Sequence, residues 1–116
     1  AQPLPLKAPE QTTESIFVKS DKKIVKINLN DIQYIEAYGN YIKIYTDVMV
    51  LTPKTLTEFL AELPENFVRI HKSFVINFDK LKLIEGNQIV LQDESKLAIG
   101  KSFRKDIFRK LWILRN

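Results

Sequence analysis

Residues 32 to 46, IQYIEAYGNYIKIYT, decide the fold class of this chain. Two arms rich in isoleucine and tyrosine flank Gly39-Asn40, a pair that is typical of two-residue hairpin turns. In the second arm, Ile42 and Ile44 alternate with tyrosine and lysine, which places apolar and polar side chains on opposite faces. The stretch therefore predicts an antiparallel β-hairpin with one buried face.

Similar β-prone segments lie on both sides of this hairpin. Upstream, SIFVKS and IVKINL are separated by residues 21 to 23, which predicts a further hairpin, and VMVLT follows downstream as another strand. FVRIHKSFVINF supplies short apolar runs, and LKLIE, QIVLQ and KLAIG are separated by turn residues at 86–87 and 93–95. The last three segments predict a meander of three short strands.

Helical spacing occurs in two places. In residues 55 to 63, an apolar i, i+3, i+4, i+7 stripe follows a Thr55 and Glu58 pair with capping-box spacing, and Pro64 is expected to end the helix. Near the C-terminus, Ser102 is expected to cap a helix with one apolar and one basic side. Its apolar residues are Phe103, Ile107, Phe108, Leu111 and Trp112, and its basic residues are Arg104, Lys105, Arg109 and Lys110. The fold class is therefore mainly β, with a short middle helix and a C-terminal helix.

Length and composition indicate one folded domain. The chain has 116 residues, 45% hydrophobic and 28% charged, which predicts a globular protein with a single core. Residues 1 to 14 hold three of the five prolines and no hydrophobic period, so they are interpreted as a linker from an upstream domain, with the folded domain over residues 15 to 116. Because the sequence has no membrane-length apolar run, no signal-peptide pattern and no cysteine, we expect a cytoplasmic protein with no membrane partner.

Positive charge is concentrated at the C-terminal end. The net charge is +4, and the chain from residue 96 onward carries seven basic residues against one acid, Asp106. Such an excess favours a polyanionic partner, because charge governs association rather than fold.

The residues needed for common catalytic sites are scarce. His71 is the only histidine, cysteine is missing from the sequence, and the three glycines are scattered singly, so no metal cluster, thiol nucleophile or phosphate-binding glycine loop is visible. We therefore expect a binding protein that is not an enzyme and has no cofactor or metal.

Three polar segments are candidates for binding, because recognition residues concentrate on loops held by a rigid scaffold. They are Tyr38-Gly39-Asn40-Tyr41, Arg69-Ile70-His71-Lys72-Ser73, and Gly100-Lys101-Ser102-Phe103-Arg104-Lys105. Each has a structural alternative. Asn40 is compatible with a purely geometric turn, Arg69 and His71 with internal pairing, and the third segment with a solvated basic helix face.

Four stretches follow one another along the chain: IQYIEAYGNYIKIYT, TLTEFLAELPENF, VRIHKSFVIN and KLAIGKSFRKDI. In this order they resemble the LytTR family of bacterial DNA-binding domains, and the similarity runs from about Ser15 to the final helix. The resemblance implies an elongated fold of three short antiparallel sheets, in which neighbouring loops insert into successive major grooves. It also implies the effector half of a two-component response regulator, joined to a phosphorylatable receiver domain.

The resemblance further implies which residues contact DNA. The family's contact positions correspond to Asn40 in the first loop, Lys72 after the motif histidine and Lys101 after the last strand, with Arg104 as a phosphate contact. Arg69 and Asn77 match the motif and are expected to support a loop from behind. The complete set of expected DNA-binding residues is Tyr38, Gly39, Asn40, Tyr41, Lys43, Arg69, His71, Lys72, Ser73, Lys101, Ser102 and Arg104. The implied partner is double-stranded DNA with paired direct repeats, bound by two copies of a domain that is monomeric in isolation.

Two alternatives stay open from the sequence. One is a protein-interaction or sensory β-module whose basic helix docks an acidic partner. The other is single-strand or RNA binding, which requires aromatic side chains displayed on a sheet face. Tyr34, Tyr38, Tyr41 and Tyr45 are the candidates, although we expect at least two of them to serve as cross-strand pairs.

Overall fold

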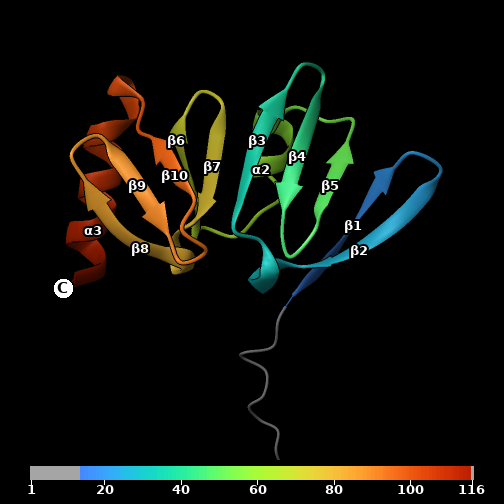
Figure 1. Cartoon of the computed structure of the whole chain (residues 1–116), viewed down its shortest axis with the longest axis horizontal. Helices are drawn as coiled ribbons and strands as arrows, with labels where there is room; N and C mark the ends of the chain where they lie inside the picture. Colours follow the sequence, from blue (N-terminus) through green and yellow to red (C-terminus); the bar gives the residue numbers. More distant parts are fainter. Residues whose placement is uncertain (1–13, 116) are drawn as a thin grey trace, which may run out of the picture.

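The computed structural model describes residues 14–115 and contains ten β-strands in three antiparallel sheets with two α-helices (Figure 1). The strands are β1 (Ser15–Ser20), β2 (Lys23–Asn28), β3 (Tyr34–Tyr38), β4 (Tyr41–Tyr45), β5 (Met49–Thr52), β6 (Phe67–His71), β7 (Phe74–Asn77), β8 (Leu81–Glu85), β9 (Gln88–Leu91) and β10 (Lys96–Ala98). The helices are α2 (Leu56–Leu60) and α3 (Arg104–Arg115), and the 3-10 turns are η2 (Leu29–Asp31), η3 (Phe78–Lys80) and η4 (Lys101–Phe103). The expected linker lies outside the described residues except for Glu14, whose backbone oxygen accepts a hydrogen bond from the Leu29 amide.

The central sheet has five strands in the order β5-β4-β3-β7-β6. The predicted hairpin forms its middle, with β3 and β4 paired from Tyr34↔Tyr45 to Tyr38↔Tyr41. Ile42 and Ile44 are fully buried, as their alternation predicts. The meander β10-β9-β8 and the β1–β2 hairpin form the other two sheets, so the predicted mainly β fold is confirmed.

The hydrophobic interior consists of two clusters, whereas the chain length predicted a single core. Val75 and Ile76 are neighbours on β7, and both are fully buried, but Val75 belongs to the cluster against α2 and the β1–β2 hairpin. Ile76 belongs to the cluster under the meander and α3. Because successive strand residues point to opposite faces, the central sheet is covered on both sides and divides the interior.

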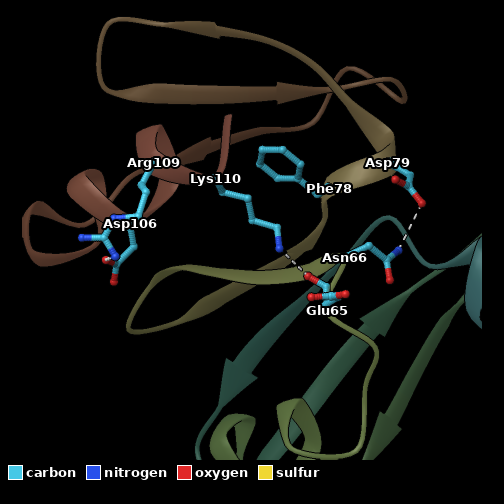
Figure 2. Close-up of a pocket in the computed structure, with 7 residues that line it drawn as sticks. All are labelled: Glu65, Asn66, Phe78, Asp79, Asp106, Arg109 and Lys110. Carbon is cyan, nitrogen blue, oxygen red and sulfur yellow. Dashed lines mark hydrogen bonds and ion pairs between the residues drawn. The ribbon is translucent and has the colours of Figure 1, made fainter. Parts of the chain in front are cut away.

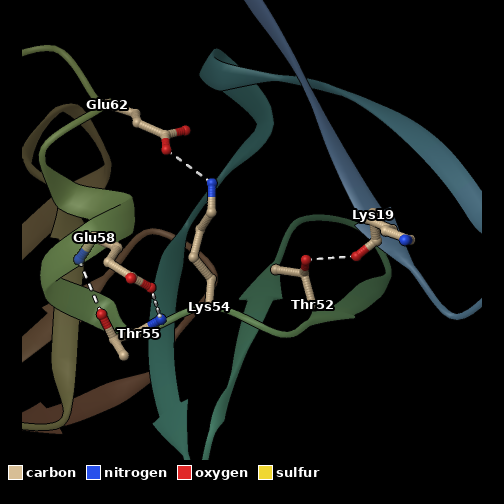
Figure 3. Close-up of polar contacts among 6 residues, drawn as sticks. All are labelled: Lys19, Thr52, Lys54, Thr55, Glu58 and Glu62. Carbon is tan, nitrogen blue, oxygen red and sulfur yellow. Dashed lines mark hydrogen bonds and ion pairs between the residues drawn. The ribbon is translucent and has the colours of Figure 1, made fainter.

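Helix α2 is shorter than its apolar stripe. Its N-terminus has the predicted capping box, in which Thr55 Oγ1 accepts from the Glu58 amide at 3.1 Å and the Glu58 carboxylate accepts from the Thr55 amide at 2.9 Å (Figure 3). The Thr55 backbone hydrogen bond lowers the pKa of Glu58. The helix ends at Leu60 and not at Leu63, because the following amides make i to i+3 hydrogen bonds and the last turn tightens before Pro64.

Helix α3 begins at Arg104, later than predicted. Ser102 lies inside the 3-10 turn η4 and is therefore not the helix cap. Ile107 is fully buried in the second cluster, but Phe108 and Trp112 are 42% and 61% exposed, so the helix buries a narrower stripe than its apolar residues indicated. The reason is that α3 lies at one end of the molecule and packs on one side only (Figure 1).

A surface pocket of about 440 Å³ lies where α3 meets the start of β6 (Figure 2). Lys110 Nζ donates to the Glu65 carbonyl at 2.7 Å, and Asn66 Nδ2 donates to Asp79 at 3.2 Å. The first contact fastens α3 to the segment before β6, and the second joins that segment to η3. No helix within residues 14–115 is long and apolar enough to cross a membrane.

Candidate nucleic-acid interface

The three predicted binding segments lie at one edge of the molecule. The β3–β4 turn, the β6–β7 turn and the segment between β10 and α3 occupy the upper edge in Figure 1. The Ala37 amide, one residue before the end of β3, donates to the Ser73 carbonyl at 2.9 Å, and the Gly100 amide donates to the Ile70 carbonyl at 2.7 Å. These two bonds join each outer segment to the β6–β7 hairpin, so their co-location is built into the backbone.

The β3–β4 turn consists of Gly39 and Asn40, between the paired residues Tyr38 and Tyr41. Gly39 takes the left-handed conformation with φ +61, whereas Asn40 is not among the described non-glycine residues with positive φ. Glycine at the first central position is typical of a type II′ turn. Backbone geometry therefore does not require asparagine at position 40, and its exposed amide is available for recognition.

A ladder of side chains supports this turn from one face of the hairpin. Tyr45 Oη donates to Glu36 at 3.1 Å, and the rings of Tyr34 and Tyr45 stack with centroids 4.4 Å apart. Burial and the Glu36 carboxylate raise the pKa of Tyr45 to about 12. Lys43 Nζ lies 4.0 Å from the Tyr38 ring centroid. Lys43 therefore packs on the Tyr38 ring next to the turn. Tyr34 and Tyr45 form the cross-strand pair that was expected for two of the four tyrosines.

The β6–β7 turn is held by Arg69. Its guanidinium donates to Thr57 Oγ1 at 3.0 Å, to the His71 carbonyl at 3.3 Å and to the Lys72 carbonyl at 2.5 Å. The expected supporting role of Arg69 is confirmed, and its partners are a hydroxyl and two carbonyls rather than a carboxylate. The Lys72 side chain stays exposed at the tip.

His71 and Ser73 shape the same turn. His71 Nδ1 accepts from the Ser73 amide at 3.0 Å, and its ring lies 5.3 Å from that of Phe74. This is the half-buried, hydrogen-bonded histidine that the structural alternative predicted. Asn77 also has a structural role, since it is 1% exposed and bonds Ile32 and Asn66, but it lies at the far end of β7 and does not support this turn.

Gly100 places the third segment against the second. A Cβ atom at position 100 would lie 2.9 Å from Phe103 Cδ2 and 3.3 Å from His71 Cα, so this close approach requires glycine. Lys101 and Ser102 follow immediately and are both exposed. Lys101 and Lys72 therefore belong to adjacent backbone segments.

Sequence reasoning missed the role of Asn87. Its Oδ1 accepts from Arg104 Nη1 at 2.5 Å, and its Nδ2 donates to the Ile99 carbonyl at 3.0 Å. The Arg104 guanidinium also lies 5.2 Å from the Phe108 ring. Arg104 is thus oriented by a neighbouring turn, and the only sequence signal was the second Gly-Asn pair at 86–87.

The cations of this edge form no ion pair with another residue of the part that the structure describes, residues 14–115. The ion pairs of residues 14–115 are Lys54–Glu62, Lys82–Glu94 and Asp106–Arg109. None of them involves Lys72, Lys101 or Arg104. The edge therefore presents unpaired positive charge to a partner.

Comparison with known proteins identifies the family. The model of the LytTr DNA-binding domain matches residues 22–112. The transcriptional regulatory protein YpdB of Escherichia coli K12 is 35% identical over 74 residues, covering 62% of this chain and 30% of that protein. The sensory transduction protein LytT of Bacillus subtilis is 26% identical over 99 residues, covering 79% of this chain and 41% of that protein. The chain thus spans less than half the length of these relatives.

A solved structure shows the same fold. The LytTr DNA-binding domain of a putative methyl-accepting/DNA response regulator from Bacillus cereus superposes with a TM-score of 0.72 at 21% identity. The match covers 84% of this chain and 95% of that one. Since the family model spans most of the sequence and the architecture agrees, the chain belongs to the LytTr DNA-binding domain family.

Proposed function

We propose that this chain binds double-stranded DNA sequence-specifically, as the effector domain of a response-regulator transcription factor. The observation that carries the proposal is the shared edge of three turns with unpaired cations. A β-hairpin fits the major groove, which is about 12 Å wide, and base edges there distinguish all four base pairs. The β3–β4 turn and the segment at Lys101 occupy successive major grooves, and the β6–β7 turn lies between them.

The residues of the edge divide into three roles. Asn40 contacts a base through its amide, while Tyr38 and Tyr41 flank it. Lys72, Lys101, Ser102 and Arg104 contact phosphates or single base acceptors, since lysine lacks the fork with which arginine contacts guanine. Gly39, Lys43, Arg69, His71 and Ser73 set the shape of the turns.

In the full-length protein, this domain is one part of a regulatory system. A receiver domain precedes it, and two copies of the domain occupy paired direct repeats, although the isolated domain is monomeric. The protein acts in the cytoplasm and carries out no catalysis. These features go beyond the family assignment and are part of the proposal.

A rival function has one supporting observation. Phe108 and Trp112 are exposed on the basic helix α3, as on a helix that docks an acidic protein. Such a module would bind duplex DNA weakly and without sequence preference. Single-strand binding is less favoured, because Tyr34 and Tyr45 stack on each other instead of facing solvent as free platforms.

Selection of bound fragments from a random duplex library tests the proposal. We expect a recovered motif with repeated half-sites, and an affinity that falls linearly in log salt with a slope indicating several phosphate contacts. The variant Lys101→Ala then shows which group Lys101 contacts. An equal loss of affinity on all sequences indicates a phosphate, and a loss that depends on the sequence indicates a base. Recovery of no motif, with weak binding to every duplex, would refute sequence-specific binding.

A further inference from the structure

The β1–β2 hairpin carries a second group of positive charges that the three turns do not include. Lys19, Lys22, Lys23 and Lys26 are all exposed, and Asp21 is the one acidic residue between Ser15 and Asn28. None of the four lysines takes part in an ion pair among the described residues. With four lysines and one aspartate, the hairpin therefore has a net charge of +3.

The position of this hairpin is fixed by the central sheet. Thr52, which is 3% exposed at the end of β5, donates from Oγ1 to the Lys19 carbonyl at 2.5 Å (Figure 3). Strand β1 pairs only with β2, so no strand ladder joins the hairpin to the central sheet. The buried Thr52 hydroxyl anchors the hairpin beside the sheet instead. The charges at the tip are thus held in a defined place.

That place adjoins the β3–β4 turn. Lys19, Ser20 and Asp21 line a surface hollow of about 500 Å³ together with Tyr41, Leu51 and Pro53. Tyr41 is the residue that follows Asn40 at the predicted base contact. In Figure 1 the tip of the β1–β2 hairpin rises toward the same side of the molecule as the turns, at the end opposite α3.

We propose that the β1–β2 hairpin is a phosphate-binding arm that extends the DNA interface beyond the three turns. An element inserted in a major groove is bordered by a phosphate backbone on each side, and duplex DNA carries one charge per about 1.7 Å of axis. Lys22 and Lys23, at the tip, contact the backbone that borders the groove occupied by the β3–β4 turn. The inference rests on the proposed DNA-binding function.

The chemistry of the arm sets what it contributes. Lysine is a point charge on a flexible stem and binds phosphate without a preferred planar geometry. Phosphate contacts position a protein on the duplex and carry no sequence information. The arm therefore adds affinity on every sequence and leaves the ratio of specific to non-specific binding unchanged.

The test compares two variants with equal loss of charge. The hairpin variant, Lys22→Gln with Lys23→Gln, removes the cations at the tip. The control variant, Lys80→Gln with Lys82→Gln, removes two cations from η3 and β8. These two elements follow the end of β7 that lies away from the turns. Fluorescence anisotropy measures the affinity for the selected duplex and for a random-sequence duplex of the same length between about 50 and 200 mM salt. Circular dichroism verifies that both variants fold.

For the hairpin variant we expect a log–log salt slope that is shallower by about 1.8, the loss of two phosphate contacts, with equal weakening on both duplexes. The control variant should keep the wild-type slope. Equal salt slopes for the wild type and the hairpin variant would overturn the proposal that the hairpin binds phosphate. The lysines, together with the exposed Phe17 and Ile24, would then face a protein partner. Equal loss in both variants would also overturn the proposal, because net charge alone would explain the change. Wild-type protein that binds no duplex would refute the proposed function itself, and this is measured first.

Discussion

Arg69 and Asn40 represent two kinds of residue at the proposed interface. Arg69 is half-buried and directs its guanidinium to three acceptors inside the protein. Asn40 is exposed, and the left-handed conformation in its turn is taken by the preceding residue, Gly39. Loss of the first should alter the shape of the edge, and loss of the second should alter what the edge recognises.

Arg69→Lys should lower the free energy of unfolding by about 1–2 kcal/mol, because one ammonium group cannot reach a hydroxyl and two carbonyls in the geometry of the planar fork. DNA affinity should fall by the same factor on all sequences, since the turn loses its shape. Denaturant unfolding and anisotropy measure the two effects. Arg109→Lys, at an exposed ion pair of 3.7 Å, is the matched control and should change neither. An Arg69 variant with unchanged stability would show that these hydrogen bonds do not hold the turn.

Asn40→Ala should reduce discrimination at one base pair by about 1–3 kcal/mol and leave protein stability unchanged. The amide provides both a donor and an acceptor, which alanine lacks. Competition binding with single-base variants of the selected duplex measures the loss. Asn30→Ala, exposed in η2 at the other end of the hairpin strands, should behave as wild type. Unaltered selectivity in Asn40→Ala would give the turn a purely structural role.

At the scale of elements, the β3–β4 hairpin joins a binding turn to the sheet interior. Its cross-strand ladder runs from Tyr34–Tyr45 through Glu36–Lys43 to Tyr38–Tyr41. No ion pair joins Glu36 to Lys43 within residues 14–115, because Glu36 accepts from Tyr45 and Lys43 lies over Tyr38. Each charge thus contacts an aromatic neighbour on the same face of the hairpin.

The unfolding free energy of the wild type should decline as pH rises from 10 to about 12. Burial and Glu36 raise the Tyr45 pKa in the folded state, so the fold favours the neutral phenol. This contribution is complete below pH 10 and is lost as pH passes through the folded-state value. The Tyr34 pKa is raised too, so Tyr45→Phe should show a smaller decline rather than none. Urea unfolding at several alkaline pH values measures this decline in the unfolding free energy. Tyr41→Phe, which changes an exposed tyrosine, is the control. Parallel pH profiles for wild type and Tyr45→Phe would contradict the ladder.

At the scale of the whole molecule, one sheet carries two hydrophobic clusters. Ile35 lies in the cluster on the α2 side and Ile76 in the cluster on the α3 side, and both are fully buried. Strands β3 and β7, which carry these residues, pair with each other. The clusters should therefore fold together, although they do not form one continuous core.

Ile35→Ala and Ile76→Ala should each cost about 2–5 kcal/mol of stability, and each should shift the unfolding of the whole domain. Trp112, the sole tryptophan, reports on the α3 end, whereas far-UV circular dichroism reports on all sheets. We expect the two probes to give the same midpoint in both variants. A tryptophan transition that stays at the wild-type midpoint in Ile35→Ala would mean that the clusters unfold independently.

The sequence by itself determined the local elements and the chemistry available at their ends. Alternation placed Ile42 and Ile44 inside, the Thr55 and Glu58 spacing located the cap of α2, and the motifs from Tyr34 to Asn77 indicated the family. These features depend on residues a few positions apart, so periodicity and turn chemistry are sufficient to predict them. The DNA contacts assigned to Asn40, Lys72 and Lys101 stay predictions.

Only the tertiary structure decided which turns share an edge, how the interior divides and which stripe of α3 is buried. The bond from Ala37 to Ser73 and the bond from Gly100 to Ile70 join segments about thirty or more residues apart in the sequence. Alternation shows which side chains are buried, but it does not show which strand lies beside which, because pairing and register depend on the packing of the entire chain. The same limit applies to the bond from Arg69 to Thr57 and to the bonds of Asn87 with Ile99 and Arg104, because these partners lie twelve or more residues away in the sequence.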